Sequence, residues 1–295
     1  MIYVSSACIK KNRIDTVICQ MAESGIRNIE LSGGTDYYDG IEHDLREWKE
    51  RYQLKYACHA YFPPPKEPFV VNLASCNDEI YRRSLEHYDN CIDLLQRIGC
   101  SVLSIHAGFL IEIEKSDLGG RVNCKVIYDE GEAYSRFCYA YERLSKRCRE
   151  RNIKLYLENN VLSHENYIAF EQQNYFMMTD YQSILYMKEK LDFDLLLDLG
   201  HLYVSSNTLG LTYEKQCEYL KPHVRWIHVS ENNGIRDEHK PLQEESVILK
   251  ELYKIYTEKL NVTLETVGEI SDILKSLKFV KGGESEENIV WTAGN

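Results

Sequence analysis

The chain has 295 residues, of which 44% are hydrophobic and 27% are charged, and this composition excludes a disordered, collagen-like or coiled-coil protein. The formal net charge of −11 disfavours nucleic acid and anionic membranes as partners, because an acidic surface repels phosphate groups. At this length, two ordinary domains or one large fold such as an α/β barrel both fit.

The cysteines and the N-terminus predict a cytoplasmic protein with reduced thiols. Ten cysteines occur without a CxxC pair, and the opening MIYVSSACIKK has no basic region followed by a long apolar stretch. No segment approaches the ~18 uninterrupted apolar residues of a membrane-spanning helix.

Along the chain, short runs rich in β-branched and aromatic residues alternate with longer segments whose apolar residues recur at helical spacing. The short runs predict eight strands, at residues 2–5, 28–31, 55–60, 101–106, 154–158, 194–198, 224–229 and 262–265. The longer segments predict helices with one buried face, among them 78–98, 132–151, 181–190, 213–220 and 247–259. We therefore expect an α/β protein with one (β/α)8 TIM barrel domain over residues 1–278 and a polar C-terminal tail over 279–295.

A doubly wound sheet is the alternative, but it predicts a glycine-rich phosphate turn after the first strand. Here that strand runs into Ser5-Ser6-Ala7-Cys8, which favours the barrel. Two segments without clear periodicity, 108–125 and 164–179, follow the fourth and fifth predicted strands. Both are expected to be active-site loops, because barrel enzymes carry such loops after the carboxyl ends of their strands.

Ionisable side chains recur where the predicted strands end, and the carboxyl ends of barrel strands share one rim. The residues at these ends are His59, His106, Glu158 in LYLENN, Asp198 in LLLDLGH, His228 in WIHVSEN and Glu265 in TLET. Three further candidates, His201, Asp237 and His239, follow the sixth and seventh strands closely. One such histidine alone is more often a packing residue, but the joint pattern predicts a metal site.

Each carboxylate follows an apolar run that would draw it into the barrel mouth, where an unpaired charge is costly and a divalent cation removes that cost. Mixed histidine and carboxylate ligands suit Zn²⁺, Mn²⁺ or Fe²⁺ better than Ca²⁺ or Mg²⁺.

These residues and their flanking motifs (HAYF, IHAGF, LENN, LDLGH, IHVSENNGIRDEHKPL and LET) resemble the xylose isomerase-like TIM barrel superfamily, almost from end to end. That superfamily includes sugar phosphate isomerases and epimerases and the endonuclease IV family. The resemblance implies that Glu158, Asp198, His228 and Glu265 hold one divalent metal. It also suggests a homo-oligomer, since relatives are often dimers or tetramers.

In the endonuclease IV branch, positions resembling five further residues hold additional metals, up to three in all. These are His59, His106, His201, Asp237 and His239. Three departures weigh against that branch: prolines are interposed at 63–68, Glu238 replaces the usual arginine between Asp237 and His239, and no basic cluster with interleaved aromatics lies on the rim loops.

The resemblance thus implies an enzyme, a divalent-metal-dependent isomerase or epimerase of a small sugar, sugar acid or sugar phosphate. Glu158 and Glu265 would act as the acid/base pair around a metal-stabilised enediolate, unless both are only ligands and a water moves the proton. His201 or Arg236 would bind a substrate oxygen or phosphate. An endonuclease IV-type zinc phosphodiesterase for abasic DNA and a non-catalytic ligand-binding barrel remain as alternatives.

For three side chains near the rim, the sequence allows two interpretations each. Tyr61 and Phe62 would form an apolar wall for the carbon face of the substrate, or simply pack in a loop. Glu30, at the end of the second predicted strand, is either a polar anchor in the pocket or part of a salt bridge in the barrel mouth.

Overall fold

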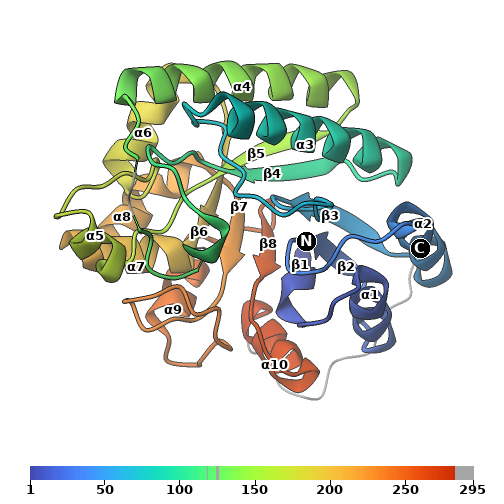
Figure 1. Ribbon diagram of the computed structural model, residues 1–295. Helices are drawn as coiled ribbons and strands as arrows, with labels where there is room; N and C mark the ends of the chain where they lie inside the picture. The colour runs from blue at the N-terminus through green and yellow to red at the C-terminus, as the bar shows by residue number, and fades with distance from the viewer. Residues whose placement is uncertain (118, 124–125, 283–295) are drawn as a thin grey trace.

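A computed structural model describes residues 1–117, 119–123 and 126–282, and its centre is a closed ring of eight parallel strands in sequence order (Figure 1). The strands are β1 (Ile2–Ser5), β2 (Asn28–Leu31), β3 (Lys55–His59), β4 (Val102–His106), β5 (Lys154–Glu158), β6 (Asp194–Asp198), β7 (Val224–Val229) and β8 (Asn261–Leu264). β1 pairs with both β2 and β8, so the sheet has no free edge.

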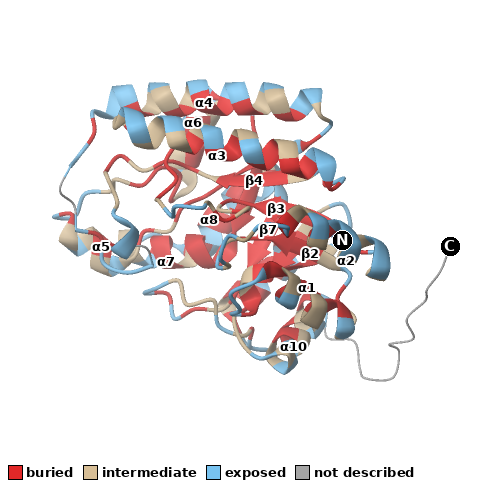
Figure 2. Ribbon diagram, turned by 45° about the vertical axis from the view of Figure 1, so that its right-hand side comes forward, coloured by how far each residue is buried: buried red, intermediate tan, exposed pale blue. Residues whose placement is uncertain are grey.

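Helices follow the strands and cover the outside of the ring, where Figure 2 shows buried faces turned toward the strands. They are α1 (Ile14–Glu23), α2 (Ile41–Tyr52), α3 (Asp78–Arg97), α4 (Glu130–Glu150), α5 (His164–Ala169), α6 (Tyr181–Lys190), α7 (Leu199–Leu209), α8 (Tyr213–Leu220), α9 (Val247–Ile255) and α10 (Ile270–Val280). The expected single-domain (β/α)8 TIM barrel is confirmed.

The barrel strands are apolar on both faces because one face packs on the helices and the other fills the interior. Leu195, Leu196 and Leu197 of β6 are all buried. Side chains alternate between the two faces of a strand, so residues two apart share a face. An interior apolar cluster, formed by Tyr3, Ala57, Tyr156, Leu196 and Trp226, therefore lies one layer below the ionisable strand ends.

The observed strands differ slightly from the prediction. β3 ends at His59, β4 begins at Val102, and β8 covers Asn261–Leu264, so Glu265 lies just beyond its strand. Its backbone N–H still donates to the Val229 carbonyl at 2.9 Å, which keeps Glu265 at the rim.

Two helices were not expected. α7 follows β6 without a connecting loop, because the Asp198 side chain accepts a hydrogen bond from the His201 N–H at 2.7 Å and caps the helix. α5 lies inside the segment 164–179 that was expected to be irregular. The other segment, 108–125, includes residues 118 and 124–125, which lie outside the described residues.

At the C-terminus, α10 ends at the buried Val280, two residues inside the expected tail, and 283–295 lie outside the described residues. Within the described ranges, no helix is long and apolar enough to cross a membrane. The nine cysteines in those ranges are free thiols.

Candidate metal centre

The carboxyl ends of six strands bring ionisable side chains to one rim of the barrel. Strand register places His106 beside Glu158 and Asp198 beside His228. His59 ends β3 and Glu265 follows β8, so the ring carries these groups around most of its circumference.

Glu158, Asp198 and His228 form the centre of this arrangement. Ligand atoms of the three residues lie within 4.8 Å of one another, and all three side chains are at most 1% exposed. Both carboxylate oxygens of Glu158, Oδ2 of Asp198 and Nδ1 of His228 lack a hydrogen-bond partner. Buried acceptors of this kind are costly unless something satisfies them. A divalent cation fits, because it would neutralise the carboxylates and accept their lone pairs.

His228 is oriented by Glu30 of β2. Its Nε2 lies 2.9 Å from Oε1 of Glu30, whose Oε2 accepts a hydrogen bond from Thr263 at 2.9 Å. The other ring nitrogen, Nδ1, therefore faces Glu158 at 3.3 Å and Glu265 at 3.5 Å. A carboxylate beside the outer nitrogen of a histidine is a common feature of metal-ligating histidines. Glu30 is thus the salt-bridge partner of a rim histidine, buried below the pocket.

His59 and His106 form a second group on the other side of Glu158. Each has a ring nitrogen 3.3 Å from Oε2 of Glu158, and their Nε2 atoms lie 3.2 Å apart. Nδ1 of His59 lies 2.9 Å from the Ser104 hydroxyl, which fixes its ring. His59, His106 and Glu158 are close enough to share an ion.

A third group consists of His201, Asp237 and His239. Asp237 Oδ2 lies 3.2 Å from His201 Nε2 and 2.9 Å from His239 Nε2. His201 Nδ1 bonds the Asn159 carbonyl oxygen at 2.9 Å, which leaves Nε2 for the pocket side. His239 has a positive φ of 49°, and such non-glycine conformations concentrate at functional sites.

Burial and charge shift the ionisation of these groups in different directions. Burial raises the pKa of Asp198 to about 6, and the neighbouring Asp237 and Glu158 add to this rise. Burial also acts to raise the pKa of Glu158, but the imidazoles of His106 and His59 hold it well below its ordinary value. Burial lowers the pKa of His106 to about 4. The site therefore holds several buried carboxylates close together with too few positive charges to neutralise them all.

A cavity of about 970 Å³ opens above the cluster. Its lining includes eight of the residues named from the sequence, namely His59, Tyr61, His106, His201, Arg236, Asp237, His239 and Glu265. Glu158, Asp198 and His228 are not among the lining residues, because they lie beneath it. Of the two candidate acid/base glutamates, only Glu265 faces the cavity.

Three side chains differ from the sequence interpretation. Phe62 is fully buried and does not line the cavity, so only Tyr61 of that pair forms its wall. The Arg236 guanidinium lies at the rim and pairs with Glu165 at 2.8 Å. Glu238 does not line the cavity, since it pairs with Lys240 at 2.7 Å and accepts from the Asn233 N–H. Its charge therefore stabilises a loop and does not face the site.

Sequence reasoning overlooked two asparagines that follow Glu158 in LENN. Asn159 makes reciprocal hydrogen bonds with the backbone of Asp198, at 2.7 and 3.1 Å. The Asn160 amide donates to the carbonyls of Ala107, Gly108 and Met177 and ties together the loops after β4 and β5. Two adjacent polar residues directly after a buried strand were the available signal.

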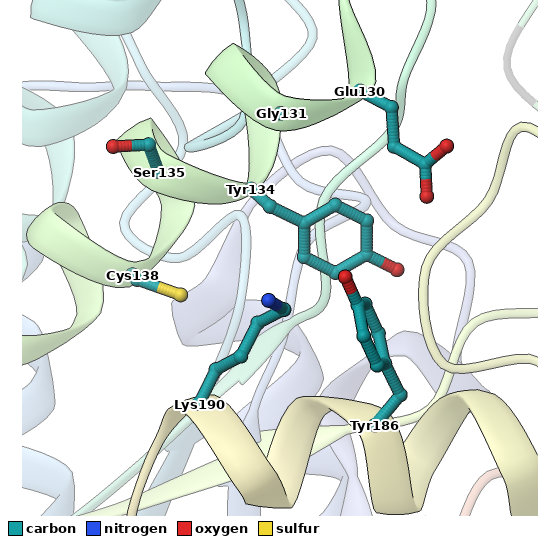
Figure 3. Close-up of a pocket in the computed structure, with 7 residues that line it drawn as sticks. All are labelled: Glu130, Gly131, Tyr134, Ser135, Cys138, Tyr186 and Lys190. Atoms are coloured by element: carbon teal, nitrogen blue, oxygen red, sulfur yellow. The ribbon is translucent and has the colours of Figure 1, made fainter.

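A second hollow of about 590 Å³ lies on the outer surface between α4 and α6 (Figure 3). The rings of Tyr134 and Tyr186 meet there with centroids 5.2 Å apart, and Lys190 packs on the Tyr186 ring. Among the described residues, no metal-ligating cluster lies in this hollow.

A comparison with known proteins assigns this barrel to a family. Residues 19–281 match the xylose isomerase-like TIM barrel family. No curated protein sequence matches the chain significantly.

Among solved structures, a D-tagatose 3-epimerase-like protein superposes with a TM-score of 0.69 at 18% identity, covering 95% of each chain. D-psicose 3-epimerase from Clostridium cellulolyticum H10 gives 0.64 at 14% identity, with 95% of this chain and 98% of that one covered. The 3-keto-D-glucoside 4-epimerase of E. coli gives 0.62 at 10% identity, with coverage of 95% and 98%. At these identities the likeness establishes the fold, and with the match over residues 19–281 the chain belongs to the xylose isomerase-like TIM barrel family.

Proposed function

We propose that this protein is a divalent-metal-dependent isomerase or epimerase of a small carbohydrate. The observation that carries the proposal is the buried group of Glu158, Asp198 and His228, whose unpaired ligand atoms lie beneath a large cavity. Sugar epimerases among the structural neighbours support the same reaction class.

Glu158, Asp198, His228 and Glu265 would hold the metal. Their donor set of one imidazole and three carboxylates suits Mn²⁺, Fe²⁺ or Zn²⁺. When bound, such a cation polarises a sugar carbonyl and its neighbouring hydroxyl, which lowers the pKa of the proton on the carbon between them.

Glu265 and Glu158 would move that proton. Glu265 faces the cavity, where its carboxylate can accept a proton from a bound sugar. Glu158, at the end of β5, lies 3.3 Å from Nδ1 of His228, the nitrogen that Glu265 also faces. Around the ring, β5 is three strands away from β8, which Glu265 follows. We assign removal of the proton to Glu265, which faces the cavity, and its return to a water held by Glu158, which lies beneath the cavity.

Around the reacting atoms, polar and apolar side chains would orient the sugar. His201 lines the cavity with its Nε2 3.2 Å from Asp237, and Tyr61 lines the wall next to the His106 ring. Arg236 would contact substrate only after releasing Glu165, which makes it a rim group in this proposal. The free thiols of the described cysteines fit a reducing, cytoplasmic compartment.

A zinc phosphodiesterase is the second candidate, and one observation favours it. The His59–His106 and His201–Asp237–His239 groups adjoin the central cluster and could hold a second and a third metal. Against it, the cavity lining outside the metal cluster carries as many acidic as basic side chains, whereas a nucleic-acid groove needs an excess of positive charge.

The experiment is hydrogen exchange in D₂O. The purified chain, loaded in turn with Mn²⁺, Fe²⁺ and Zn²⁺, is incubated with ketoses, aldoses and their phosphates, and deuterium next to the carbonyl is followed by NMR. We expect exchange that chelation abolishes and that Glu265→Gln slows by about 10²–10⁴-fold. Glu258→Gln, at an exposed glutamate in the turn after α9, is the control and leaves exchange unchanged.

Two outcomes would contradict the proposal. Absence of exchange in every sugar and with every metal would remove the isomerase and leave a ligand-binding barrel. Nicking of abasic duplex DNA, lost in Glu158→Gln and accompanied by about three zinc ions per chain in elemental analysis, would select the phosphodiesterase.

A further inference from the structure

The cavity above the metal cluster is much larger than one sugar ring. Pockets of about 300–1,000 Å³ hold drug-sized ligands, and this one has about 970 Å³. A single hexose is considerably smaller than such a ligand. The groups that would contact the reacting carbons, such as His201 and Glu265, supply only part of the lining.

Apolar side chains make up much of the remaining lining, and they come from loops that follow the neighbouring strands β3, β4 and β5. One wall, after β3, contains Pro64, Pro65 and Phe69. The other, after β4 and β5, contains Phe109 and Phe176, whose rings meet edge to face with centroids 5.1 Å apart.

The Phe109–Phe176 pair is held in place by the fold. An isolated bridge joins the two backbones, and the Phe109 N–H donates to the Asn72 side chain at 3.1 Å. Phe176 is buried, while Phe109 is partly exposed toward the cavity. A fixed aromatic ring presents a flat apolar surface, on which the carbon face of a sugar or another aromatic ring can stack.

Charge in the lining argues for an uncharged ligand. Outside the metal cluster, the described lining residues include three cations and three anions, namely Lys66, Lys115 and Arg236 against Asp36, Asp117 and Glu165. One cation, Arg236, is already engaged with Glu165. A phosphate subsite requires a surplus of donors and positive charge, which this balance does not offer.

We propose that the substrate is a sugar that carries a second, uncharged ring, and that this ring stacks on Phe109 in the apolar part of the cavity. The second ring is either another sugar or an aromatic group, since both offer a flat apolar face. This inference rests on the proposed function, because the metal-bound end of the cavity must take the reacting sugar.

Binding of matched ketoses tests it. Isothermal titration of the Mn²⁺-loaded full chain compares D-fructose with three derivatives at O6, namely isomaltulose, 6-O-benzyl-D-fructose and fructose 6-phosphate, and with the O4-linked disaccharide maltulose. We expect at least one compound with a second neutral ring to bind about 10-fold more tightly than fructose, and the phosphate to show no such gain. The disaccharides and the benzyl ether distinguish a second sugar from an aromatic group.

Substitutions at Phe109 test whether this residue causes the tighter binding of the second ring. Phe109→Ala should remove the gain and leave fructose affinity unchanged, and Phe109→Leu, which keeps an apolar side chain without the flat ring, should remove most of it. Tyr139→Ala, on the exposed face of α4, is the control and should keep the full gain. If no second ring improves binding, if the phosphate binds most tightly, or if the gain survives in Phe109→Leu and Phe109→Ala, the inference is wrong.

The two proposals fail separately. Deuterium exchange into fructose without any advantage for a second ring would keep the epimerase and remove the stacking site. A Phe109-dependent gain in binding, with no exchange in any bound sugar, would keep the stacking site and remove the epimerase.

Discussion

The interior of the barrel contains two layers that differ sharply although they are only two residues apart along the same strands. In the lower layer, Trp226 packs against Tyr3 and Tyr156, and its ring N–H donates to Thr263 at 2.9 Å. In the upper layer, Glu158 and Asp198 are equally buried, yet their ligand atoms lack hydrogen-bond partners. The lower layer is satisfied by the protein alone, whereas the upper layer contains buried carboxylate oxygens without a hydrogen-bond partner.

The largest expected effect breaks the lower layer. Trp226→Ala should lower the free energy of unfolding by about 3–5 kcal/mol, because it leaves a cavity and removes the hydrogen bond to the Thr263 hydroxyl. Denaturant unfolding measures this. Trp226→Phe keeps most of the volume and should lose considerably less. If Trp226→Ala were as stable as the parent chain, the lower layer would not be the stabilising one.

In the upper layer, we expect a substitution to weaken metal binding without lowering the stability of the metal-free chain. Asp198→Asn keeps the acceptor that caps α7 but removes a buried charge whose pKa is raised to about 6. Affinity for Mn²⁺ should fall by more than about 100-fold. The metal-free variant should unfold no more readily than the parent chain, because repulsion from Asp237 and Glu158 is relieved. Asp192→Asn, at an exposed position, is the control for both titration and unfolding. A large loss of stability would contradict the distinction between the layers.

Two buried histidines extend the comparison. The pKa of a histidine rises when it is buried among carboxylates and falls when it is buried among apolar groups. Burial acts to lower the pKa of His228, but Glu30 and Glu265 raise it well above its ordinary value. His87 of α3 has no such partner, and burial lowers its pKa to about 4.

The His87 shift predicts a stability change with its own pH window. Between about pH 6.5 and pH 4 the unfolded chain binds a proton at His87 that the folded chain does not, so stability falls as the pH falls through this range. From pH 7 to pH 5 the loss should be about 2 kcal/mol. His87→Gln should remove this part of the pH dependence in denaturant unfolding, whereas the exposed control His43→Gln should retain it. Equal pH profiles for all three chains would contradict the assignment.

The smallest predicted effect concerns Glu30, which faces His228 of the upper layer and accepts a hydrogen bond from Thr263, the partner of Trp226 in the lower layer. Glu30→Gln keeps the shape of the side chain but removes the charge that faces His228 Nε2, so Mn²⁺ affinity should drop about 10-fold. Calorimetric titration measures the drop. Thr263→Val, which removes only the hydrogen bond to Glu30, should have a weaker effect in the same direction. Unchanged affinity in Glu30→Gln would mean that His228 is oriented by other contacts.

Strand positions were predictable because β5, β6 and β7 are short apolar runs that each meet a polar residue at the rim, and the predicted bounds of these three match the structure. α7 was not predictable by periodicity, because most of its residues are buried. The buried residues include polar ones such as Ser205 and Ser206, so no single apolar face stands out in the sequence. α5 spans six residues, which is too short for a helical repeat to show.

For the candidate site, the sequence could name the side chains at the strand ends but not their depth. That Glu158 lies below the cavity while Glu265 lines it depends on which imidazoles cover each carboxylate. The role of Glu30 is a long-range effect as well, since its partners are contributed by β7 and β8. Pairs so distant in the chain leave no local pattern.

The contact between Glu30, Thr263 and His228 joins β2 to the last two strands, across the place where the first and last strands of the ring meet. His228 is therefore held in its binding orientation only in a chain whose two ends have come together. In the proposed metal site, cation affinity would therefore depend on ring closure, because Glu30, which faces His228 Nε2, is contributed by β2.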